Sequence, residues 1–242
     1  MEARETILHS ADRGRTLVIM AKAPRPGTVK TRLALSLPVE AVTELYRCLL
    51  DDTMVLARSL PNVKVAIMCP ASDVKDLTHL VRGAIAVVAQ QGDGLAAGLT
   101  SVFAQFAVPV GRKVIAFNSD SPHLPIEVLA GAFEMLTAHD VVIGPTHDGG
   151  YYLVGAKAEH PALFQGDAMG TDSALDGLLT RARRLQLSVG FTDSFYDIDV
   201  EDDLTRLAAE LRLAPSRAPR TAAWLKQWPQ LVPRLRTAGG DL

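Results

Sequence analysis

Positive charge is concentrated in one short loop of this chain. Residues 17–33, LVIMAKAPRPGTVKTRL, join an apolar run to a loop with two prolines and a glycine. The loop carries four cations: Lys22, Arg25, Lys30 and Arg32. Ligands of open α/β sheets bind beyond the carboxyl ends of strands, and a following helix offers N–H groups to anions. The loop therefore predicts a phosphate site, with a helix starting near Thr31; the alternative is a set of ordinary surface charges.

A carboxylate follows a second apolar run, in KVIAFNSDSPHLP, residues 113–125. Asp120 stands directly after the expected strand and is held in a turn by Pro122. A carboxylate oxygen in this position suits a hard divalent cation such as Mg²⁺. The alternative is that Asp120 caps the helix that follows Pro125.

Two glycines precede an aromatic run in THDGGYYLVG, residues 146–155. Asp148 at this close approach is expected to bind sugar hydroxyls, orient an acceptor or act as a base; the alternative is an Asp-Gly turn between two strands. Neighbouring residues of a strand point to opposite faces, so we expect only one of Tyr151 and Tyr152 to line a pocket.

Two further aspartates alternate in FYDIDVEDDL, residues 195–204. Asp197 and Asp199 would share one face of a strand and repel each other unless a cation such as Mg²⁺ lies between them. Asp199 alone has the alternative of a helix N-cap. Asp202 and Asp203 fall in the first turn of the next helix, where negative charge is favourable.

A third glycine-containing loop, AQQGDGLAAGL, spans residues 89–99. The paired donors and acceptors of Gln90 and Gln91 are suited to the edge of a nucleobase, although a plain glycine-rich loop explains the segment equally well.

The composition excludes several classes of protein. The chain has 242 residues, 48% of them hydrophobic, and a formal net charge of -2, which disfavours a general binder of nucleic acid or membrane surfaces. Cys48 and Cys69 are too few for a disulfide framework and suit a reducing cytoplasm. No apolar run approaches the length of a membrane span, and we expect neither export nor membrane insertion.

Short β-rich runs alternate with helical patterns along the chain. Strands are expected at residues 17–20, 63–69, 84–88, 113–118, 140–144, 151–155 and 187–191. Helices are expected at residues 39–59, 72–81, 95–106, 126–138, 171–184 and 201–213. This order predicts an α/β fold, a three-layer α/β/α sandwich whose mostly parallel sheet becomes mixed in its later part.

The chain is expected to form one main domain with extensions. Residues 1–15 are read as a flexible N-terminus and 16–212 as the nucleotide-binding catalytic domain. Prolines from residue 213 onward indicate a connector and a tail to residue 242. Trp224, Leu225, Trp228, Leu231 and Leu235 would form its apolar face. We expect this tail to dock on the domain or on a partner, which leaves a homodimer open.

Four segments together resemble a known family: KAPRPGTVKTRL, FNSDSPHLP, DGGYYLVG and YDIDVEDDL. They are similar to those of a bacterial family, labelled glycosyltransferases, in the nucleotide-diphospho-sugar transferase superfamily. The first loop also resembles that of 2-phospholactate and molybdenum cofactor guanylyltransferases. The resemblance implies a Rossmann-like GT-A fold. One departure is Ala96-Ala97-Gly98, where relatives often have Gly-Glu-Arg.

The resemblance also implies roles for individual residues. Lys30 and Arg32 match phosphate-binding positions, Asp120 matches the aspartate that holds Mg²⁺ (or Mn²⁺), and Asp199 matches a second metal ligand. Adding the residue-level interpretation, the nucleotide site is expected to comprise Ala21, Lys22, Pro26, Gly27, Lys30, Arg32, Gln91, Gly92, Asn118 and Ser119. The acceptor site is expected to comprise Asp148, Gly149, Gly150 and Tyr151. Lys30, Arg32, Asp120 and Asp148 are the expected catalytic residues.

Two reactions are compatible with this set. A glycosyltransferase would move a sugar from a nucleotide-diphospho-sugar to a small acceptor, the loop cations and Mg²⁺ stabilising the departing nucleoside diphosphate. A nucleotidyltransferase would join a nucleoside triphosphate to a phosphorylated small molecule and release pyrophosphate. We favour the first slightly. A non-catalytic nucleotide-binding module is the third alternative.

Overall fold

The sheet of this protein is mostly parallel and mixed at one side. The computed structural model describes residues 14–81, 83, 85–165 and 173–228. Its strands are β1 (Arg15–Met20), β2 (Lys64–Cys69), β3 (Ala86–Ala89), β4 (Lys113–Asn118), β5 (Val141–Pro145), β6 (Tyr151–Ala156) and β7 (Val189–Phe191). Within the described residues they form one sheet in the order β3-β2-β1-β4-β6-β5-β7. Only β6 runs antiparallel to its neighbours β4 and β5, which confirms the predicted mixed sheet.

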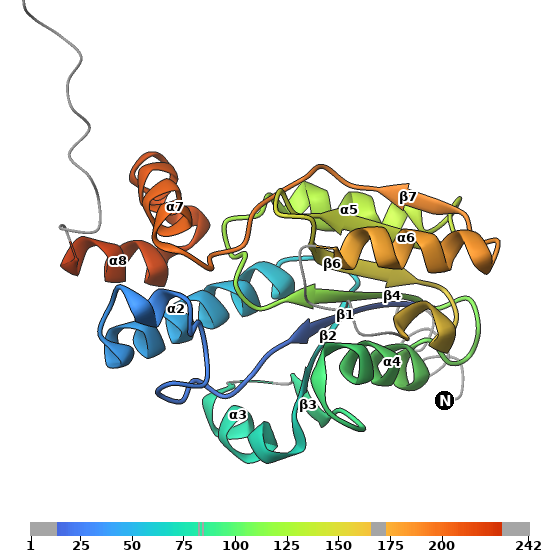
Figure 1. Ribbon diagram of the computed structural model, residues 1–242, viewed down its shortest axis with the longest axis horizontal. Coiled ribbons are helices and arrows are strands. Elements are labelled where there is room, and N and C mark those ends of the chain that lie inside the picture. The colour runs from blue at the N-terminus through green and yellow to red at the C-terminus, as the bar shows by residue number, and fades with distance from the viewer. Residues whose placement is uncertain (1–13, 82, 84, 166–172, 229–242) are drawn as a thin grey trace, which may run out of the picture.

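Helices cover both faces of this sheet (Figure 1). They are α2 (Val39–Arg58), α3 (Val74–Leu80), α4 (Gly94–Phe106), α5 (Ile126–Met135), α6 (Ala174–Arg184), α7 (Glu201–Leu213) and α8 (Pro219–Gln227). Successive side chains of β1 point to opposite faces of the sheet and so enter two different apolar clusters. Leu17 and Ile19 pack with α2, α3 and α5, whereas Val18 packs with α4 and α6. The predicted three-layer α/β/α sandwich is confirmed.

A third apolar cluster lies on the side of α2 that faces away from the sheet. There α2 packs against α7 and α8, with Trp224 and Leu225 of α8 buried. Asp52 of α2 accepts hydrogen bonds from the backbone N–H and the hydroxyl of Thr221, at 2.8 and 2.9 Å. A buried carboxylate therefore binds the first turn of α8 and holds it against the domain.

Two local expectations are wrong. The helix expected near Thr31 is instead a short 3-10 turn, Leu33–Leu35, and the long helix α2 begins only at Val39. Lys30 has a left-handed backbone, with φ at 47°, which prevents a continuous helix there. The strand expected to carry Asp197 and Asp199 is an irregular segment with a single β-bridge, between Thr146 and Phe195.

Several expectations concern residues outside those described. They are residues 1–13 of the flexible N-terminus expected at 1–15, the start of the helix expected at Thr171, and Leu231 and Leu235 of the tail. Within the described ranges, none of the helices combines the length and apolar character needed to cross a lipid bilayer.

Candidate active site

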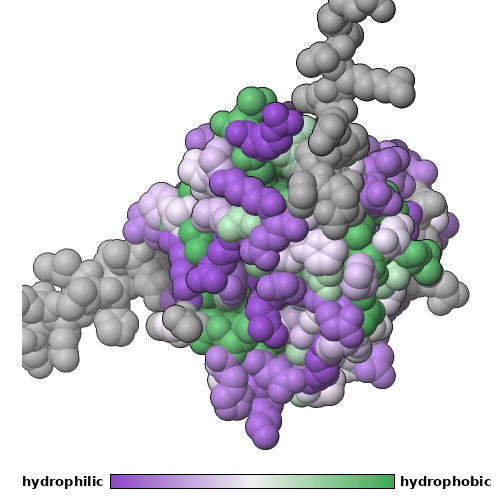
Figure 2. Space-filling view, turned by 90° about the vertical axis from the view of Figure 1, so that its left-hand side faces the viewer, coloured by the Kyte–Doolittle hydropathy of each residue, from purple (hydrophilic) through white to green (hydrophobic). Residues whose placement is uncertain are grey.

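The topology brings two of the predicted motifs together. β1 and β4 are parallel neighbours, with Met20 paired to Asn118, so the loops that follow them start side by side. The parallel strands point toward one side of the molecule (Figure 1). The surface on that side is hydrophilic in its middle, with smaller hydrophobic areas around it (Figure 2). The residues described below lie at the carboxyl ends of the strands, as expected for an open α/β sheet.

Residues before α3 hold the first loop in place. The carboxylate of Asp73 accepts hydrogen bonds from the backbone N–H of Ala23, at 2.8 Å, and from the guanidinium of Arg25, at 2.7 Å. Arg25 also donates to Asp76. Burial tends to raise the pKa of Asp73, but the bonds from Ala23, Ser72 and Arg25 outweigh burial and leave this pKa below its ordinary value. Arg25 therefore anchors the loop, rather than acting as one of four equivalent phosphate cations.

The middle of α2 supports the same loop from the other side. The hydroxyl of Tyr46 accepts a hydrogen bond from the backbone N–H of Lys22, at 3.1 Å, and lies 2.9 Å from the hydroxyl of Ser119. Tyr46 thus connects the loop after β1 to the loop after β4. The side chain of Lys22 is exposed and lines the cavity described below.

Lys30 is the central cation of the site. Its side chain is only 5% exposed, and its ammonium donates to Asp120 and, at 2.7 Å, to Asp199. Burial would lower the pKa of Lys30, but the two carboxylates outweigh burial and raise this pKa above its ordinary value. Lys30 is therefore charged, despite being buried. Arg32 is exposed and lies 3.6 Å from the second carboxylate oxygen of Asp199.

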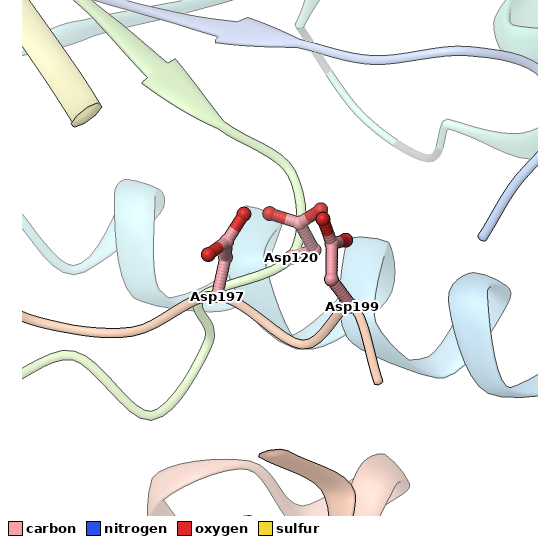
Figure 3. Close-up of side chains that lie close together, drawn as sticks. All are labelled: Asp120, Asp197 and Asp199. Carbon is pink, nitrogen blue, oxygen red and sulfur yellow. The ribbon is translucent and has the colours of Figure 1, made fainter. Parts of the chain in front are cut away.

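Asp120, Asp197 and Asp199 form an acidic cluster. Asp120 follows β4, the other two precede α7, and their side chains point toward one another (Figure 3). One carboxylate oxygen from each lies within 4.8 Å of the others. Burial and the charges of Asp120 and Asp199 raise the pKa of Asp197 to about 7. The cluster therefore has an excess of negative charge that Lys30 does not fully compensate.

The hydrogen bonds at the helix starts rule out the capping alternatives for Asp120 and Asp199. The carboxylate of Asp203 caps α7 by accepting the backbone N–H groups of Asp199 and Val200, at 3.0 and 2.9 Å. Asp199 is therefore not the cap, and its side chain is directed to Lys30 instead. Helix α5 begins after Pro125 without a side-chain cap, so Asp120 does not cap it.

The cluster has the donor set of a Mg²⁺ or Mn²⁺ site. All three side chains supply oxygen, the ligand that hard divalent cations prefer. Within the described residues, the Oδ1 atom of Asp120 is buried and has no hydrogen-bond partner. Such an atom is costly unless something binds it. The residues present therefore fit a divalent cation.

Two cavities meet at this cluster. The first, called here the loop cavity, has a volume of about 570 Å³. Lys22, Thr28, Lys30, Arg32, Gln90 and Leu95 are among its lining residues. Its volume lies within the range of small-molecule sites, and its cations lie on the side of the first loop. This cavity is suited to a phosphate-bearing ligand with an apolar or aromatic part.

The second cavity, called here the hairpin cavity, has a volume of about 290 Å³ and extends along the loop between β5 and β6. Thr146 donates a hydrogen bond to Asp148 at 2.5 Å, and the backbone N–H of Gly150 donates to the same oxygen at 3.3 Å. The loop is thus both a hairpin turn and a cavity wall. Tyr151 packs on the α4 side, whereas Tyr152 is buried on the opposite face and its hydroxyl contacts Thr192. Both tyrosines nevertheless line this cavity, because it borders the consecutive residues 151–154 of β6, so the expectation that only one of them lines a pocket is wrong.

The predicted site residues divide into two sets. Those that line a cavity are Ala21, Lys22, Lys30, Arg32, Asn118, Ser119, Asp120, Asp148, Gly150, Tyr151 and Asp199. Asn118 lines the hairpin cavity rather than the loop cavity. Those that line neither cavity, as far as the described residues define them, are Pro26, Gly27, Gln91, Gly92 and Gly149.

Other lining residues were not predicted from the sequence. They include Thr28, Val29, Thr31 and Tyr46. Of the two glutamines expected at the edge of a nucleobase, Gln90 lines the loop cavity and Gln91 lines neither cavity. The side-chain amide of Gln90 donates to the carbonyls of Gly92 and Gly94, at 2.8 and 3.2 Å, and so is fixed at the cavity wall. Tyr46 lies within a helix and has no local motif.

One protein-family profile matches the middle of the chain. The profile of a family described as "Uncharacterized protein conserved in bacteria (DUF2064)" matches residues 53–171. None of the curated proteins is significantly similar to the chain.

Solved structures of similar fold match a larger part of the chain than the family profile does. A protein of Desulfovibrio desulfuricans G20, provisionally named a nucleotide-diphospho-sugar transferase, is 27% identical, with a TM-score of 0.81 over 90% of this chain and 96% of that one. The 4-diphosphocytidyl-2C-methyl-D-erythritol synthase of Anaerococcus prevotii DSM 20548 is 13% identical, with a TM-score of 0.56 over 83% and 97%. Rv0371C of Mycobacterium tuberculosis H37Rv, solved with manganese, is 18% identical, with a TM-score of 0.50 over 80% and 97%.

The fold and these similarities define the class of the protein. It has the GT-A-like fold of the nucleotide-diphospho-sugar transferase superfamily, as the resemblance of the four segments implied. Within that superfamily, the chain is similar to the D. desulfuricans protein and, over residues 53–171, to the bacterial family whose profile it matches.

Proposed function

We propose that the protein is a divalent-metal-dependent glycosyltransferase that moves a sugar from a nucleotide-diphospho-sugar to a small acceptor. The observation that carries this proposal is the position of the acidic cluster at the junction of two cavities. The loop cavity has three cations on its walls, whereas the hairpin cavity is rich in carboxylates. A donor whose diphosphate lies at the loop and whose sugar reaches the junction matches this division of charge.

The chain's cations have a direct role in this proposal. Lys22, Lys30 and Arg32 would bind the diphosphate and stabilise the charge that develops on it as the bond to the sugar breaks. Asp120, Asp197 and Asp199 would hold Mg²⁺ or Mn²⁺, and a bound metal would act as a Lewis acid on the phosphate oxygens. The manganese found with a protein of the same fold supports this choice of ion.

Asp148 is the candidate residue for the accepting group. It is exposed at the hairpin cavity, and one of its oxygens is held by Thr146 and Gly150. A carboxylate oriented in this way is suited to accept a hydrogen bond, and then the proton, from an attacking hydroxyl. Gly150 and Tyr151 would shape the same wall.

Nucleotidyl transfer is the second candidate. The cationic loop cavity favours it, because a triphosphate needs more positive charge than a diphosphate. The A. prevotii synthase of similar fold, named for its diphosphocytidyl product, also supports it. In this reaction an acceptor phosphate would attack the α-phosphorus and pyrophosphate would leave. The same residues would bind the nucleotide.

The test is a thermal-unfolding panel of the full chain with Mg²⁺. The ligands are the four nucleoside triphosphates and the UDP-, GDP-, ADP- and dTDP-sugars, because a ligand that binds only the native state raises the melting temperature. We expect one diphospho-sugar to raise it most, and only with Mg²⁺. A preference for a free triphosphate would instead favour nucleotidyl transfer.

Variants separate binding at the site from binding elsewhere. Arg32→Gln is expected to reduce the ligand-induced rise in melting temperature. The matched control is Arg47→Gln, because Arg47 is an exposed arginine of α2 that lines neither cavity. No shift with any ligand would contradict the proposal. Tight binding without turnover of any donor would indicate a non-catalytic nucleotide-binding module.

A further inference from the structure

The charges around the hairpin cavity differ from those of the loop cavity. Among the described residues, four carboxylates line it: Asp120, Asp148, Asp197 and Asp199. The described cation on its wall is Arg32, which it shares with the loop cavity and which already lies 3.6 Å from Asp199. Lys30 lines the loop cavity instead. The hairpin cavity is therefore negatively charged.

A metal ion does not reverse this balance once a donor is bound. The positive charge of a divalent ion, Lys30 and Arg32 would be matched by the acidic cluster and the donor's diphosphate. A phosphate on the second substrate would then face Asp148 without a cation of its own.

Two polar side chains of the cavity offer hydrogen-bond acceptors that no described residue uses. The Oδ1 atom of Asn118 is buried and has no partner among the described residues. Asp148 offers its second carboxylate oxygen, since the bonds from Thr146 and Gly150 both use Oδ1. Acceptors of this kind are satisfied by hydroxyl groups and repel phosphate oxygens.

The remaining walls are apolar. Leu95, Leu99 and Tyr151 lie along one side, and burial raises the pKa of the Tyr151 hydroxyl above its ordinary value, so this group is neutral. At about 290 Å³, the cavity is at the lower end of the range for small-molecule sites. A molecule of monosaccharide size, with hydroxyls on one side and C–H groups on the other, fits these walls.

We infer that the second substrate of this protein is an uncharged, hydroxyl-bearing small molecule rather than a phosphorylated one. This inference rests on the proposed function, because it assumes that the nucleotide occupies the loop cavity. It goes further by naming the chemical class of the acceptor and by making Asp148 the residue that excludes anions. It also separates the two candidate reactions, since the nucleotidyl alternative needs a phosphorylated acceptor.

The test compares matched pairs of probes on the full chain, with Mg²⁺ and a saturating nucleoside diphosphate. The base of this diphosphate is that of the nucleotide-sugar that raises the melting temperature most in the unfolding panel. The pairs are glucose against glucose 6-phosphate and glycerol against glycerol 3-phosphate. The affinity for each probe is measured by ligand-observed NMR titration. We expect the uncharged member of at least one pair to bind about tenfold more tightly than its phosphate ester.

Two variants place the effect in the hairpin cavity. Asp148→Arg is expected to bring the phosphorylated member to equal or tighter binding, because it replaces a carboxylate with a cation at the cavity wall. His147→Arg is the control: it adds charge at the adjacent exposed residue, which lines neither cavity. Both positions are exposed, so neither change is expected to prevent folding.

The outcomes distinguish this inference from the proposed function. If no nucleotide binds, the proposed function fails first. If the nucleotide binds but the wild-type chain prefers the phosphorylated members, binds neither member of any pair, or responds equally to both variants, then the inference alone is wrong.

Discussion

The ammonium of Lys30 lies 2.7 Å from a carboxylate oxygen of Asp199 and also donates to Asp120. One buried lysine thus bridges the two segments that form the acidic cluster, from β4 and from the residues before α7. Lys30 neutralises part of the charge to which a divalent cation would bind. Phosphates in the loop cavity would offer Lys30 a second set of partners. We therefore expect metal and nucleotide to bind cooperatively.

Replacing Lys30 tests this coupling. Lys30→Met leaves Asp120 and Asp199 without their cation, so we expect the free energy of unfolding to fall by about 3 kcal/mol in the absence of metal. We also expect Mn²⁺ alone to bind more tightly, since it no longer competes with the ammonium, and the nucleotide to bind more weakly. Calorimetry and urea unfolding measure these effects. The control is Lys22→Met, an exposed lysine of the same loop, which should leave stability within about 0.5 kcal/mol.

Arg32 is exposed and is expected to contribute mainly to the binding of the nucleotide, not to the stability of the fold. We predict that Arg32→Gln weakens the Mg²⁺-dependent affinity for the nucleotide about tenfold, the size of one charge-assisted hydrogen bond. Calorimetry at two salt concentrations provides the check, because part of this contribution is screened by salt. Equal affinity of the variant and the wild-type chain would remove Arg32 from the nucleotide site.

Asp120 is expected to be essential for metal binding and dispensable for the fold. In Asp120→Asn, Asp199 still pairs with Lys30, so the melting temperature should change by only a few degrees. The additional stabilisation by Mn²⁺ together with nucleotide should disappear. A large loss of stability in the absence of ligand would show instead that Asp120 is a structural residue.

The anchoring of the loop by Asp73 predicts a dependence of stability on pH. The pKa of Asp73 is lower in the folded chain than its ordinary value, so its contribution is complete well above the unfolded pKa of about 3.9 and is lost as the pH falls through the folded pKa. We expect Asp73→Asn to cost about 2 kcal/mol at pH 7, from hydrogen bonds to a charged group. Urea unfolding from pH 7 to pH 3 should show this difference shrinking toward zero. A difference that persists unchanged at pH 3 would contradict the assignment.

Much of the fold follows from local patterns. The strand Lys113–Asn118 has its predicted bounds, because its apolar run is bordered by charged and polar residues. The parallel arrangement then places the ends of β1 and β4 together, and so brings Lys30 near Asp120. The sequence predicts this meeting because parallel strands share one functional edge.

Other parts of the site depend on tertiary contacts that no motif records. Arg25 resembles the other loop cations in sequence, but two aspartates near the start of α3 bind it. Tyr46 lies in the middle of a helix, and only the packing of α2 brings its hydroxyl to the loop. The sequence alone leaves Asp199 open as a helix cap. In the structure its backbone N–H donates to the carboxylate of Asp203, which is the capping residue.

The proposed reaction breaks the bond between the sugar and the nucleoside diphosphate, and ³¹P NMR of the products tests this most directly. The full chain is incubated with Mg²⁺, the nucleotide-sugar selected by the unfolding panel and a pool of uncharged hydroxylated acceptors, with Asp120→Asn as the control. We expect release of a nucleoside diphosphate by the wild-type chain and none by the variant. Release of pyrophosphate from a triphosphate and a phosphorylated acceptor, without turnover of any diphospho-sugar, would contradict this expectation.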